Sequence, residues 1–355
     1  MKVLHIGEYV NGGVATYIKT LLEGLAEKNV DNYLLLSQYK SGKTWNIENG
    51  KIFYYPYKRS ISGLFRAGKI AQKYIEKINP DIIHVHSSWA GVFVRIPYLW
   101  KKKRPKIIYT PHGWSFIMEI PKLKKYIYAV VERILTNITD RIITISQYEY
   151  NQGIKYGIDK NKMIMTYNGV SEANRNRAMP DLNVDLMKIN LLFVGRIDKA
   201  KGLDIFLNYY REFDFKNIHL YVAGESVLED CSLINSHNVT YLGWIDYEDI
   251  DSYYNLCDAV IVPSRWDGFG LSAIEAMRNC KAVIASNRAA LPELILNQKN
   301  GYIFDLNDSL SLKNILEKLD KHSLSILGMN GYKRYKALFT SKIFCENTLK
   351  VYEEL

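Results

Sequence analysis

The 355-residue sequence is poor in the features that mark disulfide-rich, zinc-binding and membrane-spanning proteins. Its four cysteines, Cys231, Cys257, Cys280 and Cys345, are scattered without a CxxC spacing. That argues against a disulfide framework or a zinc site and suits a reducing cytoplasm. No apolar run approaches the roughly 18 residues needed to span a bilayer. Residues 1–7 are typical of a buried strand and lack the long apolar stretch of a signal peptide, so we expect a cytoplasmic protein.

The net charge of +10 is unevenly distributed along the chain. Residues 1–180 hold 28 Lys and Arg against 13 Asp and Glu, an excess of +15, whereas residues 181–355 hold 19 against 24, an excess of −5. The basic half includes the lysine-rich segments 101–104 and 122–125. Such a half suggests an anionic surface or substrate, although a solvated lysine-rich face has the same composition. Nucleic acid is not expected, because the sequence has no recognised binding motif and its charges do not follow one helix.

The hydrophobic pattern predicts alternating strands and helices. Short apolar runs predict strands at residues 3–6, 33–36, 82–86, 107–110, 142–145 and 163–166, and again at 190–194, 220–223, 239–242, 259–262 and 282–285. The segments between them are mostly long enough for crossover helices, which implies parallel sheets covered on both faces. A polar, strand-free linker at 171–189 separates the two series.

We therefore predict an α/β protein of two Rossmann-like, doubly wound domains, with a ligand site in the cleft between them. The N-terminal domain is expected at 1–170 and the C-terminal domain at 171–335. A last helix, at 336–355, is expected to cross back onto the first domain.

Two loops that follow predicted strands suit phosphate binding. Gly12 and Gly13 open the first helix, where glycine allows close backbone approach and the helix N-terminus favours negative charge; a simple tight turn fits this pair equally well. Arg196 and Lys201 lie on one loop before a helix that is predicted to begin near Gly202. Two cations suit a diphosphate, and because cations oppose the dipole at a helix N-terminus, they indicate an anion between them. A basic loop without a ligand is the alternative.

A turn of Gly268, Phe269 and Gly270 leads from a strand into the helix that carries Glu275. The free amides of such a turn can bind a hydroxyl or phosphate oxygen. Asp267 and Glu275, eight residues apart, can accept hydrogen bonds from sugar hydroxyls. The apolar neighbours of Glu275 predict a mostly buried helix, on which a carboxylate requires a polar partner; a surface charge is the alternative.

Histidines at strand ends are the catalytic candidates. His112 follows the strand at 107–110, at its carboxyl end. His84 and His86 share one face of another strand because side chains alternate with a period of two. We expect His84 to be a core residue.

These motifs resemble those of the retaining glycosyltransferases of family 4, which have the GT-B fold, and the resemblance covers essentially the whole chain. Four motifs carry it: Gly12-Gly13, Arg196 with Lys201, His112, and Asp267 followed after seven residues by Glu275.

The resemblance implies a role for each motif. Glu275 would hold the ribose of a UDP-sugar and Asp267 the donor sugar, while Arg196 and Lys201 would neutralise the departing diphosphate. His112 would contact the transferred sugar near its reacting carbon. Further donor contacts are implied for Gly12, Gly13, Trp244, Gly268, Phe269, Gly270 and Leu271.

Such enzymes retain anomeric configuration by same-face attack, in which the leaving phosphate takes the acceptor proton. No protein nucleophile is needed, so electrostatic stabilisation carries most of the catalysis. Arg196, Lys201, Asp267 and His112 are therefore the expected catalytic residues. No cofactor and no metal are expected, since Arg and Lys replace the metal in this family, and the DxD pattern at 249–251 is interpreted as a solvated helix face.

The sequence departs from the family pattern at three places. Asp267 stands where glutamate is usual, and Cys280 stands where glycine is common. Residues 287–290 replace the usual glycine pair, so Arg288 either adds a contact to the donor phosphates or merely alters the loop.

The acceptor is expected on the basic first domain. Residues 114–126 combine aromatic, aliphatic and lysine side chains as an interfacial surface does; an ordinary amphipathic helix packed on the core is the alternative. Within the family, the sequence most resembles bacterial enzymes that extend polyprenyl-diphosphate-linked sugars for surface polysaccharides, namely O-antigen, capsule or exopolysaccharide.

We therefore expect a hexosyltransferase or N-acetylhexosaminyltransferase that is peripheral at the inner face of the cell membrane. The alternatives are a non-catalytic nucleotide-sugar-binding protein and a GT-B epimerase or phosphorylase.

Overall fold

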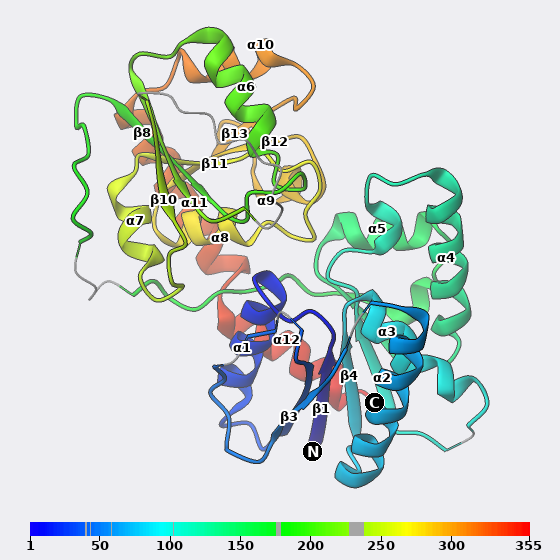
Figure 1. The fold of residues 1–355 in the computed structure, drawn as a ribbon. Helices are drawn as coiled ribbons and strands as arrows, with labels where there is room; N and C mark the ends of the chain where they lie inside the picture. Colours follow the sequence, from blue (N-terminus) through cyan, green and yellow to red (C-terminus); the bar gives the residue numbers. More distant parts are fainter. Residues whose placement is uncertain (40, 43, 58, 102, 175–178, 227–237) are drawn as a thin grey trace. The chain divides into compact units, whose positions relative to one another are not determined.

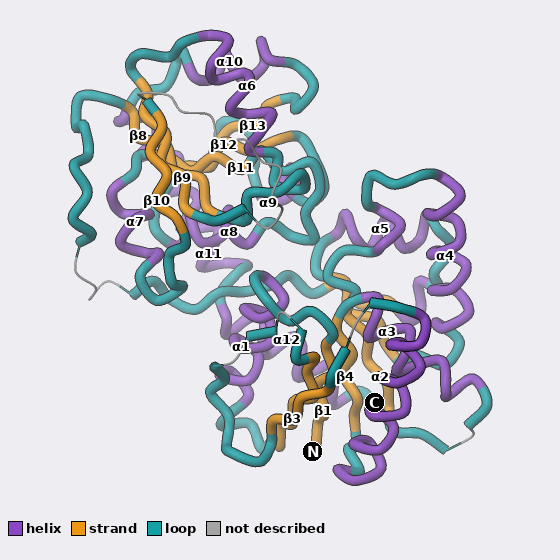
Figure 2. Tube along the Cα trace, viewed as in Figure 1, coloured by secondary structure: helices purple, strands orange, loops and turns teal. Residues whose placement is uncertain are grey.

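The structure is a computed structural model that describes residues 1–39, 41–42, 44–57, 59–101, 103–174, 179–226 and 238–355. Cys231, Lys102 and part of the predicted linker lie outside the described residues. The chain divides into an N-terminal unit, Met1–Ser171 with Ser341–Leu355, and a C-terminal unit, Glu172–Thr340. Each unit is an α/β sandwich around one sheet (Figures 1 and 2).

The N-terminal unit contains seven parallel strands in the order β3-β2-β1-β4-β5-β6-β7. The strands are β1 Lys2–Gly7, β2 Asp31–Ser37, β3 Ile52–Tyr55, β4 Ile82–His86, β5 Lys106–Thr110, β6 Arg141–Thr144 and β7 Met163–Met165. The helices are α1 Gly13–Leu25, α2 Ile61–Ile78, α3 Ser88–Arg95, α4 Lys122–Thr136, α5 Gln147–Lys155 and α12 Ser341–Glu353, with short 3-10 turns at Ile96–Leu99, Ser115–Ile117 and Lys160–Lys162.

Side chains alternate across each strand, so the two faces of this sheet bury different groups. Leu4 and Ile6 of β1 face an apolar core that also contains residues of α2, α3 and α4. His5 of β1 faces the other side, where α1 and α12 pack against each other. This second face buries polar rings together with apolar ones.

The C-terminal unit contains six parallel strands in the order β10-β9-β8-β11-β12-β13. The strands are β8 Ile189–Val194, β9 Ile218–Ala223, β10 Val239–Gly243, β11 Ala259–Val262, β12 Ala282–Ser286 and β13 Gly301–Phe304. The helices are α6 Leu203–Phe213, α7 Ile250–Leu256, α8 Leu271–Arg278, α9 Leu291–Leu294, α10 Ser309–Leu316 and α11 Lys321–Leu338. Helices α6 and α10 contribute to the apolar core on one face, and α8 packs on α11.

The prediction of two doubly wound parallel domains is confirmed. All the predicted strands are present, and the structure adds two that were not predicted, β3 and β13. The last helix, α12, begins at Ser341, while residues 336–338 complete α11. The three cysteines within the described residues, Cys257, Cys280 and Cys345, form no disulfide.

The interpretation of residues 114–126 as one interfacial surface is wrong for its first part. Trp114 and Phe116 are fully buried and stack on each other, and the Trp114 ring nitrogen donates to the Glu149 carbonyl. Burying these two rings removes a large apolar area from water. Leu123 and Tyr126 on α4 are exposed, as that interpretation requires.

A buried ion pair holds α4 to the rest of the N-terminal unit. The Arg95 guanidinium of α3 donates to a Glu132 carboxylate oxygen of α4 at 2.7 Å, and both side chains are buried. The Tyr109 hydroxyl of β5 donates to the other carboxylate oxygen at 3.0 Å, and the Arg95 guanidinium lies over the Tyr109 ring. This network fixes which face of α4 points inward.

Glu132→Ala should lower the free energy of unfolding of the N-terminal unit by about 3–5 kcal/mol, because Arg95 would stay buried without its carboxylate. Urea denaturation followed by circular dichroism measures this loss. Glu76→Ala, which removes an exposed pair with Lys101 in the same unit, is the matched control and should cost less than about 0.5 kcal/mol. Equal losses in the two variants would show that the buried pair is not the anchor of α4.

Candidate active site

In both sheets the strand order reverses next to the first strand, between β1 and β4 and between β8 and β11. Ligands of open α/β sheets bind beyond the carboxyl ends of the strands at such points. The predicted motifs occupy the loops that leave these ends. Gly12 and Gly13 follow β1, whereas Arg196 with Lys201 follow β8, and Asp267 follows β11.

The loops after β8 and β11 contact each other through their backbones. The Arg265 amide donates to the Ala200 carbonyl at 2.8 Å. Gly202 has a φ of +69°, and a Cβ there would lie 2.0 Å from the Pro263 carbonyl oxygen. Only glycine permits both this conformation and this approach. The residue thus brings Lys201 alongside Asp267.

Each predicted phosphate-binding cation has a carboxylate partner within the unit. The Lys201 ammonium donates to Asp267 at 2.5 Å, and the Arg196 guanidinium pairs with Asp198 at 2.9 Å. Asp198 also accepts a hydrogen bond from the Lys201 amide. Two aspartates of the chain itself therefore partly neutralise these cations.

Asp267 is held as a carboxylate. Burial favours its neutral form, but the Lys201 charge and the backbone amides of Phe269 and Gly270 outweigh burial and keep the pKa of Asp267 below its ordinary value. The family resemblance implies a contact with sugar or phosphate for these same two amides. Gly268 completes the turn, and the Phe269 side chain is buried against Phe339.

Glu275 is buried on α8, as its apolar neighbours predicted. The Tyr254 hydroxyl of α7 donates to its carboxylate at 3.0 Å. Burial raises the pKa of Glu275, while the Arg278 charge and the Tyr254 hydrogen bond oppose the rise. Leu271, the first residue of α8, lies on the same helix, four residues before Glu275.

The interpretation of residues 249–251 as a solvated helix face is wrong for Asp251. This side chain is buried and accepts hydrogen bonds from the Arg278 guanidinium, at 2.6 Å, and from the Asn279 amide, at 2.7 Å. Its other oxygen accepts from the Asn174 backbone amide. Asp251 thus ties α7 and the start of the unit to α8, a role that its position along the chain did not indicate.

Trp244 follows β10 and is about half exposed, with its ring nitrogen 3.3 Å from an Asp246 carboxylate oxygen. Arg265, which was not singled out from the sequence, makes two hydrogen bonds to the Asp204 carboxylate of α6, at 2.7 and 2.6 Å. Arg288 precedes Ala289, whose φ is +51°.

His112, in the N-terminal unit, lies just after β5 with a φ of +55°, a conformation that is uncommon for a residue with a side chain. The next amide, of Gly113, donates to the buried carboxylate of Glu149 at 2.5 Å. The other Glu149 oxygen accepts from the Ile145 amide at 2.8 Å. Glu149 therefore fixes the loop that carries His112.

His112 is the outer end of a line of hydrogen-bonded side chains, which we call the histidine row: Asn32, His5, His86 and His112. His112 Nε2 lies 3.1 Å from His86 Nδ1, and His86 Nε2 lies 3.1 Å from His5 Nδ1. His5 Nε2 lies 3.1 Å from the Asn32 side-chain oxygen. Burial lowers the pKa of His112 to about 3 and that of His86 well below its ordinary value, so the row is neutral at physiological pH.

His84 is fully buried, as predicted, beside the row. Its ring nitrogens bond the Tyr352 hydroxyl of α12, at 2.6 Å, and the Thr110 hydroxyl, at 2.8 Å. Among the described residues, His5, His84 and His86 bring nitrogens close enough to hold a metal ion, but each of these nitrogens already has a hydrogen-bond partner.

The predicted glycine loop of this unit opens α1. Gly12 has a φ of +52° and caps the helix, and a Cβ there would meet nothing within 4 Å. Gly13 begins the helix, and both glycines are exposed. Glu8, which follows β1, is buried and accepts two hydrogen bonds from Arg59, at 2.7 and 3.0 Å.

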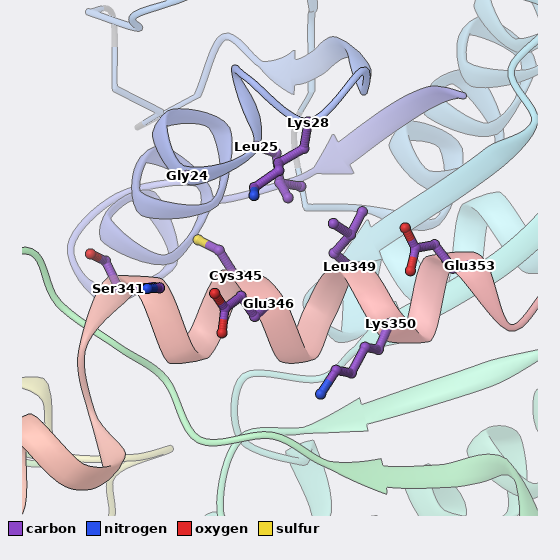
Figure 3. Close-up of a pocket in the computed structure, with 10 residues that line it drawn as sticks. Gly24, Leu25, Lys28, Ser341, Cys345, Glu346, Leu349, Lys350 and Glu353 are labelled. Carbon is purple, nitrogen blue, oxygen red and sulfur yellow. The ribbon is translucent and has the colours of Figure 1, made fainter.

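A groove of about 400 Å³ lies elsewhere in this unit, between the end of α1 and α12 (Figure 3). Gly24 and Leu25 line one wall, and Cys345 and Leu349 line the other. Helix α1 begins beyond the carboxyl end of β1, so its last turn lies toward the opposite edge of the sheet. The groove is therefore separate from the loops that carry the predicted site.

Comparison with known proteins identifies the family. The family model for glycosyl transferases group 1 matches residues 174–334, and the model for glycosyltransferase family 4 matches residues 11–174. The chain is 37% identical, over 91% of its length and 90% of the relative's, to an uncharacterized 41.2 kDa protein in the cps region of Klebsiella pneumoniae.

Two further relatives are named as glycosyltransferases. One is an uncharacterized glycosyltransferase of Methanocaldococcus jannaschii, 30% identical over 100% of this chain and 99% of the relative. The other is the UDP-Gal:alpha-D-GlcNAc-diphosphoundecaprenol alpha-1,3-galactosyltransferase of Escherichia coli, 26% identical over 73% and 71% of the two chains.

Solved structures show the same fold at low sequence identity. The sucrose-phosphate synthase of Thermosynechococcus elongatus superposes with a TM-score of 0.84 at 21% identity, over 99% of this chain and 98% of the other. Anabaena Alr3699/HepE, solved in complex with UDP-glucose, superposes with a TM-score of 0.79 at 17% identity, over 100% of both chains. The chain thus belongs to glycosyltransferase family 4 and has the GT-B type of fold.

Proposed function

We propose that the protein is a retaining glycosyltransferase that moves a hexose or N-acetylhexosamine from a UDP-sugar to a polyprenyl-diphosphate-linked glycan during bacterial surface polysaccharide synthesis. The observation that carries the proposal is the pairing of Lys201 with Asp267 where the β8 and β11 loops meet. That pairing places a cation, which can bind phosphate, beside a carboxylate, which can accept hydrogen bonds from sugar hydroxyls. A sugar diphosphate requires both.

The donor contacts follow from the chemistry of each group. The ammonium of Lys201 has three N–H donors and the guanidinium of Arg196 has five, so both can bind phosphate oxygens while keeping an aspartate partner. The carboxylate of Asp267 accepts sugar hydroxyls, and that of Glu275 accepts the ribose hydroxyls. Gly12, Gly13, Gly268, Phe269, Gly270 and Leu271 complete the donor site, with Trp244 against the base.

Catalysis in this proposal is mainly electrostatic. The departing diphosphate gains negative charge, which Arg196 and Lys201 stabilise from fixed positions, and these two cations take the place of a metal ion. No side chain acts as a nucleophile, and the leaving phosphate takes the acceptor proton on the face that it departs from. His112 contacts the sugar as a neutral imidazole, which does not oppose the positive character that develops at the reacting carbon.

The lipid-linked acceptor is proposed to approach the N-terminal unit, where the outer face of α4 would meet the membrane. Leu123, Ile127 and Ile134 are exposed, and their spacing of four and seven residues places them in one row along the helix. Exposed or half-exposed Lys122, Lys124 and Lys125, with Arg133, add positive charge. Apolar and basic side chains together suit the surface of an anionic membrane.

The outer face of α4 supports the proposal that the protein binds peripherally at the inner face of the membrane. Within the described part of the chain, none of the helices combines the length and the apolar character that crossing a bilayer requires. The name of one relative supports the acceptor class, since it refers to a diphosphoundecaprenol-linked substrate.

A thermal-shift panel of UDP-glucose, UDP-galactose and their N-acetylhexosamine counterparts tests the donor class, because a ligand that binds the folded state raises its stability. Slow hydrolysis of the stabilising UDP-sugar without acceptor would distinguish a transferase from a binding protein. A panel in which neither UDP nor any UDP-sugar raises the melting temperature would contradict the proposal.

Glu275→Ala should weaken UDP binding by about 1.5–3 kcal/mol, the range for a hydrogen bond to a charged group. Isothermal titration calorimetry measures the change. Glu317→Ala, an exposed carboxylate of the same unit, is the control and should bind UDP like the unmodified protein. Unchanged affinity in Glu275→Ala would remove this residue from the site, and a strong magnesium requirement would contradict the metal-independent mechanism.

His112→Ala should lower kcat by about 10²-fold or more while leaving UDP affinity nearly unchanged, the sign of an interaction made mainly in the transition state. Steady-state hydrolysis, calorimetry and melting temperature are measured on one preparation. A folded variant with near-normal kcat and a lowered melting temperature would mean that His112 only packs its loop.

Anionic vesicles should bind the protein at low salt and release it at high salt, because screening weakens surface attraction. Flotation measures the bound fraction. Replacing Lys122, Lys124 and Lys125 with Gln should reduce binding, whereas the same change at Lys216, Lys299 and Lys318, three exposed lysines of the C-terminal unit, should not. Equal recovery on neutral and anionic vesicles would exclude the electrostatic part of this proposal.

A further inference from the structure

Asn32, at the inner end of the histidine row, determines which nitrogen donates in each hydrogen bond of the row. The Asn32 side-chain nitrogen donates to the Val30 carbonyl at 3.3 Å, so the side-chain oxygen of Asn32 is the atom that faces His5 Nε2. A carbonyl oxygen only accepts hydrogen bonds. His5 must therefore carry a hydrogen on Nε2.

Because the rings are neutral, the donor at one end of the row determines the donor in every other bond. Burial lowers the pKa of His5 to about 4 and favours the neutral forms of His86 and His112 as well, so each ring has a single N–H. With its hydrogen on Nε2, His5 accepts at Nδ1 from His86 Nε2, and His86 accepts at Nδ1 from His112 Nε2. The only neutral arrangement that satisfies all three bonds has every hydrogen on Nε2.

We infer that Asn32, His5 and His86 are positioning residues that hold His112 in one tautomer, with its hydrogen on Nε2 and the lone pair of Nδ1 available to accept a hydroxyl of the transferred sugar. The inference rests on the proposed role of His112. It adds that His5 and His86, whose imidazoles touch no substrate, orient the His112 ring from the interior of the N-terminal unit.

Packing restrains the same ring. The His112 and His86 rings are stacked, with centroids 5.3 Å apart, and Tyr17 of α1 packs edge-on against His112 at 4.6 Å. A flipped or rotated His112 would break the bond to His86 and leave a buried imidazole nitrogen without a partner, which is costly. The left-handed backbone of His112 is held independently, through Gly113 and Glu149.

His84 is the matched control for the row. It lies on the same strand as His86, is equally buried, and packs against it at 4.2 Å between ring centroids. Its hydrogen bonds go to Tyr352 and Thr110 instead. Phenylalanine at position 84 or 86 removes two buried hydrogen bonds and keeps a ring, so both variants should lose similar stability, and only His86→Phe should release His112.

Tautomers are read directly from the nitrogen chemical shifts of protein labelled with ¹⁵N-histidine, with His112 assigned by comparison with His112→Ala. We expect a protonated Nε2 and a bare Nδ1 on His5, His86 and His112 in the unmodified protein. A His112 with its hydrogen on Nδ1 would overturn the inference without any activity measurement. Stoichiometric zinc held by His5, His84 and His86 would also overturn it, because ligand nitrogens must be unprotonated.

Kinetics test the consequence, with the UDP-sugar of the thermal-shift panel that the protein then hydrolyses fastest. His86→Phe should lower kcat at least tenfold and change UDP affinity less than twofold, whereas His84→Phe should keep kcat within twofold. His86→Gln should recover part of the rate, since its amide can accept from His112 and donate to His5.

The two proposals fail in different ways. If His112→Ala keeps a normal kcat, the proposed role of His112 is wrong. If His112→Ala loses turnover while His86→Phe does not, the role of His112 stands and its positioning by the row is wrong.

Discussion

Polar groups buried under helices must find partners inside the protein, and this constraint shapes both units. A parallel sheet covered on both faces excludes water from its strands, so a polar side chain there requires a hydrogen bond or a counter-charge. His5 and His86 meet the requirement through one another. Glu132 meets it with Arg95, and Glu275 meets it with Tyr254. The candidate site residues are the ends of such networks at the carboxyl edge of each sheet.

The candidate site residues of the two units satisfy this constraint with different electrostatics. In the N-terminal unit the groups behind His112 are neutral, because burial keeps the imidazoles unprotonated. In the C-terminal unit the groups around the β8 and β11 loops are charged and paired, as Lys201 is with Asp267. A neutral contact suits a carbon that becomes more positive, and fixed charges suit a leaving group that becomes more negative.

The sequence was sufficient for the fold class and for the placement of the site motifs at strand ends. The buried parallel strand at 259–262 is a continuous apolar run, and the structure has this strand with the same bounds. The strands β3 and β13 are short and unevenly buried. Only Tyr55 of Ile52–Tyr55 is buried, and Gly301–Phe304 begins with a glycine and is buried only at its two ends. Uneven burial weakens the hydrophobic pattern, so both strands were missed.

The partners within each site could not be read from the sequence. His5 is 81 residues from His86, and Tyr254 is 21 residues from Glu275. Spacing along the chain does not show that such pairs meet, since only the strand order brings β1 beside β4. Asp251 was misinterpreted for the same reason, because its partner Arg278 lies on another helix. The one available signal was chemical: histidines and acids in segments otherwise apolar.

The charge excess of the first half of the chain is separate from its candidate site. Exposed cations such as Lys122 and Lys124 lie on the outer face of α4, whereas the histidine row carries no charge. Glu132, on the inner face of α4, is already neutralised by Arg95. Surface attraction is screened by salt and buried hydrogen bonds are not, so the proposed membrane attraction and the proposed sugar contact should respond to different conditions. Substitutions on the outer face of α4 are therefore expected to change membrane binding without changing the environment of His112.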